Sequence, residues 1–226
     1  MTRETFDEIA SIYDESLPAH VTQHYLEKRI AYVLEHCPPG DGLDVGCGTG
    51  VLAARLQSAG YEMSGIDPSQ PMLDVLGRRA PAVNAVQGSG DELPFDDDGF
   101  DLVLTVAALH HIATPPAVRG TLAEMVRVCR PGGRIVVWDH NPRNPYWKLL
   151  TARVPQDDGS ERLIPEREVI DGIEAAGGRV LSSEALGFVP DFAPARAMKP
   201  VAAIERAVER TPLRFVCAHN VVVASK

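Results

Sequence analysis

The sequence predicts an α/β fold with a doubly wound, mostly parallel sheet of seven strands and an antiparallel C-terminal edge strand. Short apolar runs alternate with longer amphipathic stretches from residue 20 to residue 140, an order typical of a parallel sheet with helices on both faces. The run FDLVLTVAAL (100–109) is apolar almost throughout, as expected for a strand buried on both faces. The run RFVCAHNVVVAS (214–225) alternates well enough to pair with RVLSSEALG (179–187) as an antiparallel edge.

The first predicted elements lie between residues 20 and 79. The stretch HVTQHYLEKRIAYVLEH (20–36) places apolar residues near helical spacing, and the Pro-Pro-Gly run at 38–40 ends this helix. The strand GLDVG (42–46), the helix GVLAARLQSA (50–59) and the strand YEMSGID (61–67) follow. The next helix covers residues 71–79, with Ser69 as its candidate N-cap and Pro71 in its first turn.

The remaining elements complete the sheet. AVNAVQG (82–88) and FDLVLTVAAL are strands, and the helix at 116–129 is stopped by RPGG before the strand RIVVWDH (134–140). A helix at 166–176 precedes the two C-terminal strands. Residues 188–212 between those strands are rich in proline, contain one helix at about 201–210 and are interpreted as an insertion near the substrate site. The chain thus forms a single domain, 1–226, with a helical lid at 1–38.

Composition restricts the partners of the chain. The formal net charge is −9, and an acidic surface repels nucleic acid and anionic membranes. The charge is uneven, because residues 196–214 carry five bases against two acids, which we interpret as solvated surface. No apolar run approaches the roughly 18 residues of a membrane span, and no secretory signal is recognised at the N-terminus.

The four cysteines, Cys37, Cys47, Cys129 and Cys217, form no C-x-x-C pair. They also lack a histidine-rich partner at the spacing of a metal site. We therefore expect reduced thiols, no bound metal and a cytoplasmic location.

The stretch LDVGCGTG (43–50) places three glycines at alternate positions after a strand. The dinucleotide fingerprint G-x-G-x-x-G would need a glycine at Val51, and no G-K-[ST] of a P-loop follows. Asp67 ends the second strand 21 residues after Gly46, where a carboxylate can accept hydrogen bonds from ribose hydroxyls. Asp44 lies inside the first strand, where an unpaired carboxylate is costly, so it either bonds turn amides or balances a cationic ligand group.

Five stretches together resemble a known family. They are FDEIASIYDE (6–15), LDVGCGTG (43–50), GIDPSQPML (65–73), GSGDELPFDDDGFDLVLTVAALHHI (88–112) and RPGGRIVVWDHNP (130–142). The chain resembles the class I S-adenosylmethionine-dependent methyltransferases, and within them the ubiquinone/menaquinone-type group that acts on small molecules. The resemblance covers residues 6–142 well and the remainder loosely, and it implies a Rossmann-like fold.

The resemblance implies S-adenosylmethionine as the cofactor. It places the methionine end at the glycine turn, the ribose at Asp67, the adenine against Met72 and Tyr13 as a residue that closes over the site. Ser89 and Gly90 stand where the family often has Asp or Asn followed by Ala, so Asp91 could take over part of the adenine contact. The full set of predicted cofactor-binding residues is Tyr13, Asp44, Gly46, Cys47, Gly48, Asp67, Pro68, Met72, Ser89, Gly90, Asp91, Val106 and Ala107.

Candidate catalytic groups follow the fourth and fifth predicted strands. His110 and His111 follow the fourth, while Asp139 and His140 end the fifth. Adjacent residues cannot point both rings at one site, and the resemblance of the stretch ALHHI implies one histidine near the transferred methyl group and one that is packed or capping. We predict His110 near the cofactor and His111 among the acceptor-binding residues. His140 is predicted near the acceptor, where a histidine can act as a general base.

The predicted acceptor-binding residues are Tyr25, His111, Arg143, Tyr146, Trp147 and Phe192. The aromatic ones, with Phe188, suggest an apolar pocket, and Arg143, Lys148, Arg153 and Arg196 suit an anionic group. The predicted acceptor is a small molecule, aromatic, isoprenoid or anionic, methylated at oxygen or carbon.

Two other function classes compete with a small-molecule methyltransferase. A nucleotide-dependent oxidoreductase is disfavoured by Val51 and by the LPF and FDLV stretches. A catalytically silent, methyltransferase-like partner protein would retain the same cofactor motifs, so the sequence leaves this alternative open.

Overall fold

The structure is a computed structural model, and it describes residues 3–147 and 161–226. Seven strands form one sheet in the order β3-β2-β1-β4-β5-β7-β6. Their bounds are β1 (Asp41–Val45), β2 (Glu62–Asp67), β3 (Asn84–Gln87), β4 (Phe100–Val106), β5 (Cys129–His140), β6 (Arg179–Leu186) and β7 (His219–Ser225). Strands β1 to β5 pair in parallel, and β7 is antiparallel to both of its neighbours. The predicted fold class is therefore confirmed.

The antiparallel strand β7 lies one place in from the edge, and β6 is the outermost strand. Every residue of β7 is buried, whereas most of β6 is half-buried or exposed. A strand that is apolar on both faces buries more surface between two neighbouring strands than at an edge. This explains why β7 lies between β5 and β6, whereas we predicted it at a hairpin-like edge.

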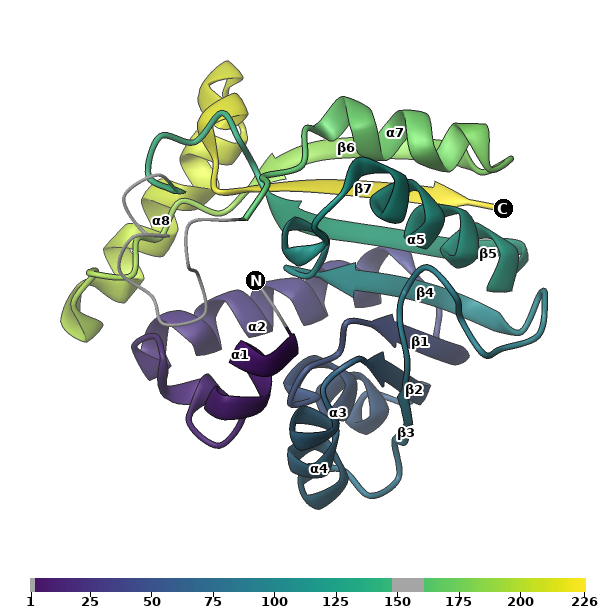
Figure 1. Cartoon of the computed structure of the whole chain (residues 1–226). Helices are drawn as coiled ribbons and strands as arrows, with labels where there is room; N and C mark the ends of the chain where they lie inside the picture. The colour runs from purple at the N-terminus through teal and green to yellow at the C-terminus, as the bar shows by residue number, and fades with distance from the viewer. Residues whose placement is uncertain (1–2, 148–160) are drawn as a thin grey trace.

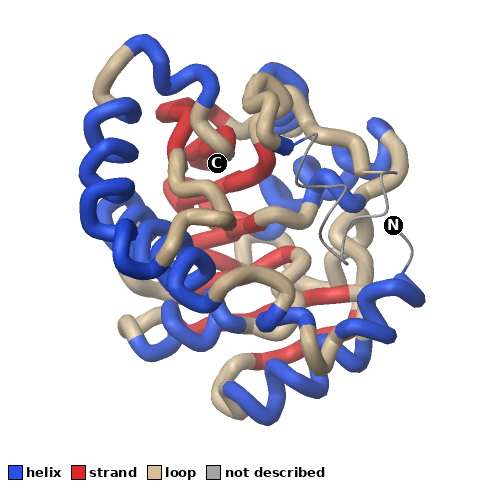
Figure 2. Tube along the Cα trace, turned by 90° about the vertical axis from the view of Figure 1, so that its left-hand side faces the viewer, coloured by secondary structure: helices blue, strands red, loops and turns tan. Residues whose placement is uncertain are grey.

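The helices cover both faces of the sheet (Figures 1 and 2). They are α1 (Arg3–Ile9), α2 (Ala19–His36), α3 (Val51–Ser58), α4 (Gln70–Arg79), α5 (Pro115–Val128), α7 (Glu166–Ala175) and α8 (Met198–Glu209). Helices α5 and α7 pack on one face with Val103 of β4, and α2, α3 and α4 pack on the other with Leu102 and Leu104. Alternate residues of β4 thus enter two different cores, as its apolar run predicts.

Local sequence signals explain most element ends. Ser69 caps α4 by accepting a hydrogen bond from the backbone N–H of Met72. The helix predicted from residue 201 begins at Met198, because Pro200 is tolerated in a first turn. The strand predicted from Arg214 begins at His219, because Thr211 and Pro212 start the short 3₁₀ helix η4 (Pro212–Val216) instead.

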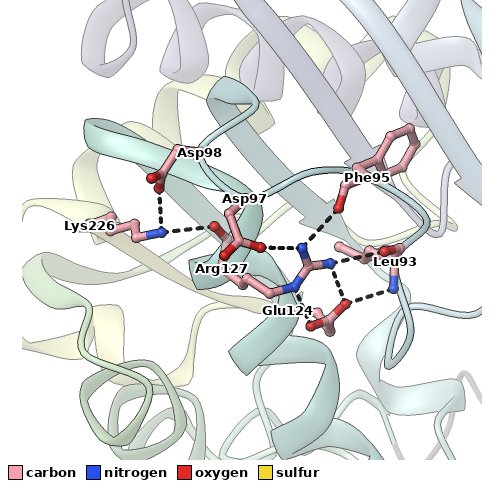
Figure 3. A network of polar contacts seen from close by, with 7 residues as sticks. All are labelled: Leu93, Phe95, Asp97, Asp98, Glu124, Arg127 and Lys226. Atoms are coloured by element: carbon pink, nitrogen blue, oxygen red, sulfur yellow. Dashed lines mark hydrogen bonds and ion pairs between the residues drawn. The ribbon is translucent and has the colours of Figure 1, made fainter.

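The acidic segment after β3 is held by Arg127 of α5 (Figure 3). Its guanidinium donates to the carbonyls of Leu93 and Phe95, each at 2.9 Å, and pairs with Glu124 and Asp97, each at 2.7 Å. The neighbouring Asp98 pairs with the C-terminal Lys226 at 2.5 Å. Arg127 therefore holds this segment through two backbone carbonyls and the carboxylate of Asp97.

All four cysteines are free thiols. None of the helices in the described part of the chain combines the length and apolar character that crossing a bilayer requires.

Candidate active site

A cavity of about 230 Å³ lies beside the carboxyl ends of β1, β2 and β4. The strand order reverses between β1 and β4, and ligands of doubly wound sheets bind at such a switch point. The predicted cofactor residues on its wall are Tyr13, Gly46, Gly48, Asp67, Pro68, Met72, Ser89, Gly90, Asp91 and Ala107. Asp44, Cys47 and Val106 adjoin wall residues in the chain but are not part of the wall.

Three glycines shape the turn after β1. Gly46, Gly48 and Gly50 have φ angles of +77°, +52° and +71°, in the left-handed region that side chains disfavour. A Cβ on Gly46 would lie 2.6 Å from the Cβ of Ala108, and one on Gly50 would collide with Leu76. A Cβ on Gly48 would meet nothing within 4 Å. The turn therefore leaves open space at Gly48 and packs tightly at the other two glycines.

Two carboxylates, Asp44 and Asp67, are buried at the ends of β1 and β2. Asp67 accepts hydrogen bonds from the backbone N–H groups of Gly48 (2.8 Å) and Ser69 (2.9 Å). Burial raises the pKa of Asp67 although these two bonds oppose the rise. Burial also raises the pKa of Asp44 to about 7, and the charge of Asp67 adds to that rise. Two buried acids that repel each other favour a cationic ligand group beside them.

The segment after β3 forms another part of the wall. Ser89 donates a short hydrogen bond to the carboxylate of Asp91. A Cβ on Gly90 would lie 3.0 Å from Cγ2 of Thr121 and 3.2 Å from Val45. This close packing against α5 explains why glycine suits the position where the resembling family often has alanine.

The turn after β4 is strained at the cavity wall. Ala107 has a φ of +54°, which is uncommon for a residue with a side chain. Its N–H donates to the carbonyl of Trp138 (2.8 Å), which holds the turn, and the next residue, Ala108, faces Gly46. Such backbone strain is concentrated at functional sites.

The N-terminal segment closes one side of the cavity with Phe6 and Tyr13. Asp7 of α1 accepts a hydrogen bond from the Ser69 hydroxyl (2.6 Å), and Asp14 accepts one from the Thr49 hydroxyl (2.7 Å). These two bonds attach the segment to the turns after β2 and β1. The sequence reasoning did not assign Phe6 to the site, although it quoted the stretch FDEIASIYDE.

His110, Asp139 and His140 form a buried polar cluster at the ends of β4 and β5. Nδ1 of His110 lies 2.6 Å from Oδ1 of Asp139, and its backbone N–H donates to Oδ2 (3.2 Å). Nδ1 of His140 lies 2.9 Å from Nδ1 of His110 and 3.3 Å from the same Oδ1. These side chains could also hold a metal ion, which the sequence spacing did not indicate. The two Nδ1 atoms and Oδ1 of Asp139 already have hydrogen-bond partners within the protein.

Asp139, His140 and the neighbouring His111 have shifted pKa values, which set their charges at neutral pH. Burial, and next to it the proximity of the basic group His110, lower the pKa of His111 to about 2 and that of His140 to about 4. Burial opposes ionisation of Asp139, but His110 and His140 outweigh it and hold the pKa of this carboxyl well below its usual range. At neutral pH Asp139 is therefore an anion, and His111 and His140 are neutral.

The two adjacent histidines, His110 and His111, do not lie where we predicted them relative to the cavity. His111 lines the cavity with its ring 5.0 Å from that of Phe6, whereas His110 is only 4% exposed and is directed at Asp139. We predicted His110 nearer to the cofactor. The partner that decides the orientation is Asp139, which lies 29 residues away in the sequence and reaches His110 through the pairing of β4 and β5.

Two basic residues near the cluster were missed. Arg29 of α2 lies with its guanidinium 5.9 Å from the ring centre of Trp138, and burial lowers the pKa of Arg29. His219 of β7 packs 5.6 Å from the ring of His140, and burial lowers its pKa well below the usual value. A signal for Arg29 existed, since it lies four residues from both Tyr25 and Val33 on the apolar stripe of α2.

The predicted acceptor residues are not gathered in one cavity. His111 is the only member of that set on the cavity wall. The side chain of Arg143 is 64% exposed and pairs with Glu166 at 3.7 Å, and Phe192 is 70% exposed. Lys148 and Arg153, predicted to meet an anionic group, lie outside the described residues.

The remaining predicted acceptor residues have structural contacts. Trp147 is buried, donates from Nε1 to the carbonyl of Ala218 (2.6 Å) and packs 3.6 Å from the ring of His140. Tyr146 bonds to Asp191, and the hydroxyl of Tyr25 donates to the carbonyl of Val189 (2.7 Å). Trp147 is thus the member of this group that reaches the histidine cluster.

Comparison with known proteins decides the family. A family model described as a methyltransferase domain matches residues 43–137, which contain the glycine turn, Asp67 and the Ser89–Asp91 segment. Over this segment the chain is similar to the methyltransferase family. The predicted resemblance to class I S-adenosylmethionine-dependent methyltransferases and the predicted cofactor, S-adenosylmethionine, are confirmed. A solved S-adenosylmethionine-dependent methyltransferase of Thermotoga maritima, described as a possible histamine N-methyltransferase, shares the fold of this chain with a TM-score of 0.74, 19% identity and coverage of 100% of both chains.

Curated relatives of this chain match over part of their length. An uncharacterized methyltransferase of Mycobacterium bovis is 39% identical over 52% of this chain and 47% of its own length. A phthiotriol/phenolphthiotriol dimycocerosates methyltransferase of Mycobacterium tuberculosis is 38% identical over 58% and 49%. A demethylmenaquinone methyltransferase of Renibacterium salmoninarum is 33% identical over 64% and 65%. The chain spans about half the length of the first two of these relatives.

The cavity fits the predicted cofactor. S-adenosylmethionine carries an ammonium and a sulfonium, and the buried pair Asp44 and Asp67 favours positive charge. The open space at Gly48 admits a ligand against the backbone, as a nucleoside amino acid without a pyrophosphate requires. Met72 is only 1% exposed but lines the cavity, and its side chain offers an apolar contact for the adenine ring.

Proposed function

We propose that this chain transfers a methyl group from S-adenosylmethionine to a small-molecule acceptor at oxygen or carbon. The observation that carries the proposal is the cavity at the β1/β4 switch point, which has the glycine turn and Asp67 on its wall and the His110–Asp139 pair adjoining it through His111. The bound cofactor would supply an electrophilic methyl group on sulfur.

In this proposal the chain holds the cofactor through three regions. Asp67 would bind the ribose hydroxyls, and the backbone at Gly46 and Gly48, with Cys47 between them, would receive the methionine end beside Asp44. Met72 and the segment Ser89–Asp91 would contact the adenine, with Pro68, Val106 and Ala107 completing the surface. The N-terminal segment 1–38 would act as the lid, since Phe6 and Tyr13 line the cavity and Asp7 and Asp14 attach the segment to the cofactor turns.

The histidine cluster would handle the proton of the acceptor. Asp139 is ionised and bonded to Nδ1 of His110, so a proton taken by His110 would go to Nε2 and the resulting cation would be stabilised by the carboxylate. His140, the second predicted catalytic residue, would assist the proton transfer through its contact with His110. His111 has a pKa too low for a general base at neutral pH and would instead shape the wall beside the methyl group.

We propose a lipophilic acceptor with an acidic hydroxyl or an activated ring carbon. The cavity wall beyond the polar residues is apolar, with Phe6, Leu109, Ile112 and Ala117. Two relatives are named for demethylmenaquinone and for phthiotriol dimycocerosates, which agrees with an apolar acceptor. The insertion 188–212 and the exposed Arg143 and Phe192 would then contact parts of the acceptor that extend outside the cavity.

Calorimetry and mass spectrometry test the proposal separately. S-adenosylhomocysteine is expected to bind at micromolar concentration and nicotinamide dinucleotides are expected not to bind. Asp67→Ala should weaken that binding at least tenfold, because hydrogen bonds to a charged group contribute about 1.5–3 kcal/mol each. Asp74→Ala, an exposed acid of the following helix α4, is the matched control and should leave binding unchanged.

Transfer itself is tested with a panel of phenols, quinols and hydroxylated lipids. The expected result is the addition of one methyl group to a member of the panel with consumption of cofactor. Cofactor binding without transfer to any acceptor would favour a catalytically silent partner protein, and binding of nicotinamide dinucleotides in place of S-adenosylhomocysteine would contradict the proposed cofactor chemistry.

A further inference from the structure

In the region from η3 (Ala195–Ala197) to η4, the basic side chains face solvent and the acidic side chains face the protein. Its five bases, Arg196, Lys199, Arg206, Arg210 and Arg214, are all exposed. Within residues 3–147 and 161–226, no carboxylate forms an ion pair with any of them. Among the described residues, these exposed bases therefore have no carboxylate that neutralises them through an ion pair.

The two acids of the same region point inward. Glu205 is 1% exposed and binds Nε2 of His24 (3.0 Å) and Nζ of Lys28 (2.7 Å), both on α2. It also accepts hydrogen bonds from the backbone N–H groups of Phe188 and Val189. Glu209 pairs with the same Lys28 at 2.5 Å and accepts from the N–H of Gly187. The acids attach α8 to the body of the protein and leave its outer face without negative charge.

The outer face of α8 is also apolar. Pro200, Ala203, Ile204 and Ala207 are exposed at helical spacings of three and four, so they form one stripe. Lys199, Arg206 and Arg210 form a second stripe beside it. The adjoining η4 adds Leu213 and Phe215, which are 60% and 50% exposed, while Ile204 is 54% exposed. We call the exposed side chains of α8 and η4 the α8 surface.

We propose that the α8 surface docks on an anionic phospholipid bilayer. Exposed large apolar side chains flanked by unpaired bases are the pattern of a helix that lies in a membrane interface. The argument rests on charge complementarity, because a chain of net charge −9 that gathers unpaired bases on one apolar face selects an anionic surface there and is repelled elsewhere. Residues 196–214, which we interpreted as solvated surface, are exposed, and the proposal assigns a partner to that surface.

The α8 surface lies at the end of the molecule where the parallel strands finish. In Figure 1, α8 projects beyond the carboxyl ends of β4 and β5, on the side of α2. Docking there would turn the acceptor side of the domain towards the lipid, which suits the lipophilic acceptor of the proposed function. The docking proposal itself does not depend on that function.

Vesicle flotation of the full chain tests the proposal. Vesicles of phosphatidylcholine with phosphatidylglycerol are expected to bind the chain, vesicles of phosphatidylcholine alone are not, and binding should fall as salt is raised. Arg206→Gln with Arg210→Gln should lower partitioning about tenfold or more, since each base near an anionic surface contributes appreciably. Ile204→Ser with Leu213→Ser should lower it similarly by removing apolar insertion.

Matched variants use exposed residues away from the α8 surface. Arg78→Gln with Arg179→Gln removes two exposed bases of α4 and β6, and Leu181→Ser removes an apolar side chain of β6 that is 42% exposed. These variants should bind vesicles as the unaltered chain does, and all variants should retain their circular dichroism and S-adenosylhomocysteine binding. Absence of phosphatidylglycerol-dependent binding, equal losses in surface and control variants, or self-association through Ile204 without vesicle binding would each overturn the proposal.

Discussion

Asp139 and His110 are joined across two neighbouring strand ends by a 2.6 Å contact between Oδ1 and Nδ1, with both side chains only 4% exposed. Asp139 lies on β5 and His110 follows β4, which pairs in parallel with β5. The same carboxylate also accepts the backbone N–H of His140 (2.6 Å). Asp139 therefore fixes the orientation of His110 and the start of the loop after β5 at once.

Replacing either member of this pair is expected to lower methyl transfer. His110→Gln and Asp139→Asn should reduce kcat by about 10²–10⁴-fold where the acceptor must lose a proton, because the base or its stabilising anion is lost. S-adenosylhomocysteine affinity, measured by calorimetry, should stay within about twofold. His36→Gln is the control, since His36 stacks on Tyr32. An unchanged kcat in both variants would remove the proton-transfer role.

Asp44 should make stability depend on pH. Its folded pKa of about 7 lies above the ordinary value of 3.8, so the folded state binds more protons than the unfolded state between these values. The free energy of unfolding should then fall as pH rises from about 4 to about 7. Asp44→Asn removes this penalty and should raise Tm more at pH 8 than at pH 5, while weakening S-adenosylmethionine binding. An equal change in Tm at both pH values would contradict the shift.

The glycines of the turn should differ in their tolerance of alanine. Gly48→Ala introduces strain of about 1–2 kcal/mol from its φ of +52° and fills space in the cavity, so it should mainly weaken cofactor binding. Gly46→Ala adds a collision with Ala108 and should lower the free energy of unfolding by a larger amount. Denaturant unfolding measures both. Combining Gly46→Ala with Ala108→Gly should restore part of the loss, and no restoration would show that the collision is unimportant.

Glu205 is expected to stabilise the junction of α2 and α8. Burial disfavours its charge, but hydrogen bonds from His24 and Lys28 outweigh this and lower its pKa to about 2. Its contribution should be complete above the unfolded value of 4.5 and be lost as pH falls towards 2. Glu205→Ala should lower the free energy of unfolding by about 3 kcal/mol at neutral pH, since it removes one of the two carboxylates on Lys28 and leaves the buried N–H groups of Phe188 and Val189 without their acceptor. The exposed Glu174→Ala is the control.

Much of the site was predictable because its parts are local in sequence. The glycine turn follows β1 within five residues, and Asp67 ends the next strand, so strand order alone brings them to one edge of the sheet. The apolar run of β4 predicted burial on both faces, and Leu102, Val103 and Leu104 enter alternate cores. These features depend on periodicity and strand polarity, which the chain carries in each segment.

Other features depend on contacts between distant segments. Arg29 enters the region of the site because α2 packs across the sheet next to Trp138, and His219 arrives on a strand inserted between β5 and β6. The predicted aromatic acceptor residues Tyr146, Trp147 and Phe192 do not line the described cavity, since Phe192 is exposed and Trp147 packs on His140. The residue types at these positions indicated which chemical groups are present, but they did not predict where each side chain points.

By itself the sequence determined the α/β fold and the edge of the sheet where a nucleoside ligand belongs, and its resemblance to known methyltransferases indicated the family and the cofactor. It could do so because hydrophobic period, turn glycines and strand-end acids act within a few residues of one another. Only the tertiary structure decided which of His110 and His111 meets the cavity, and that the two acids of α8 point inward while its bases point outward. Those outcomes depend on Asp139 and on Lys28, partners that only the packing of separate elements brings into contact.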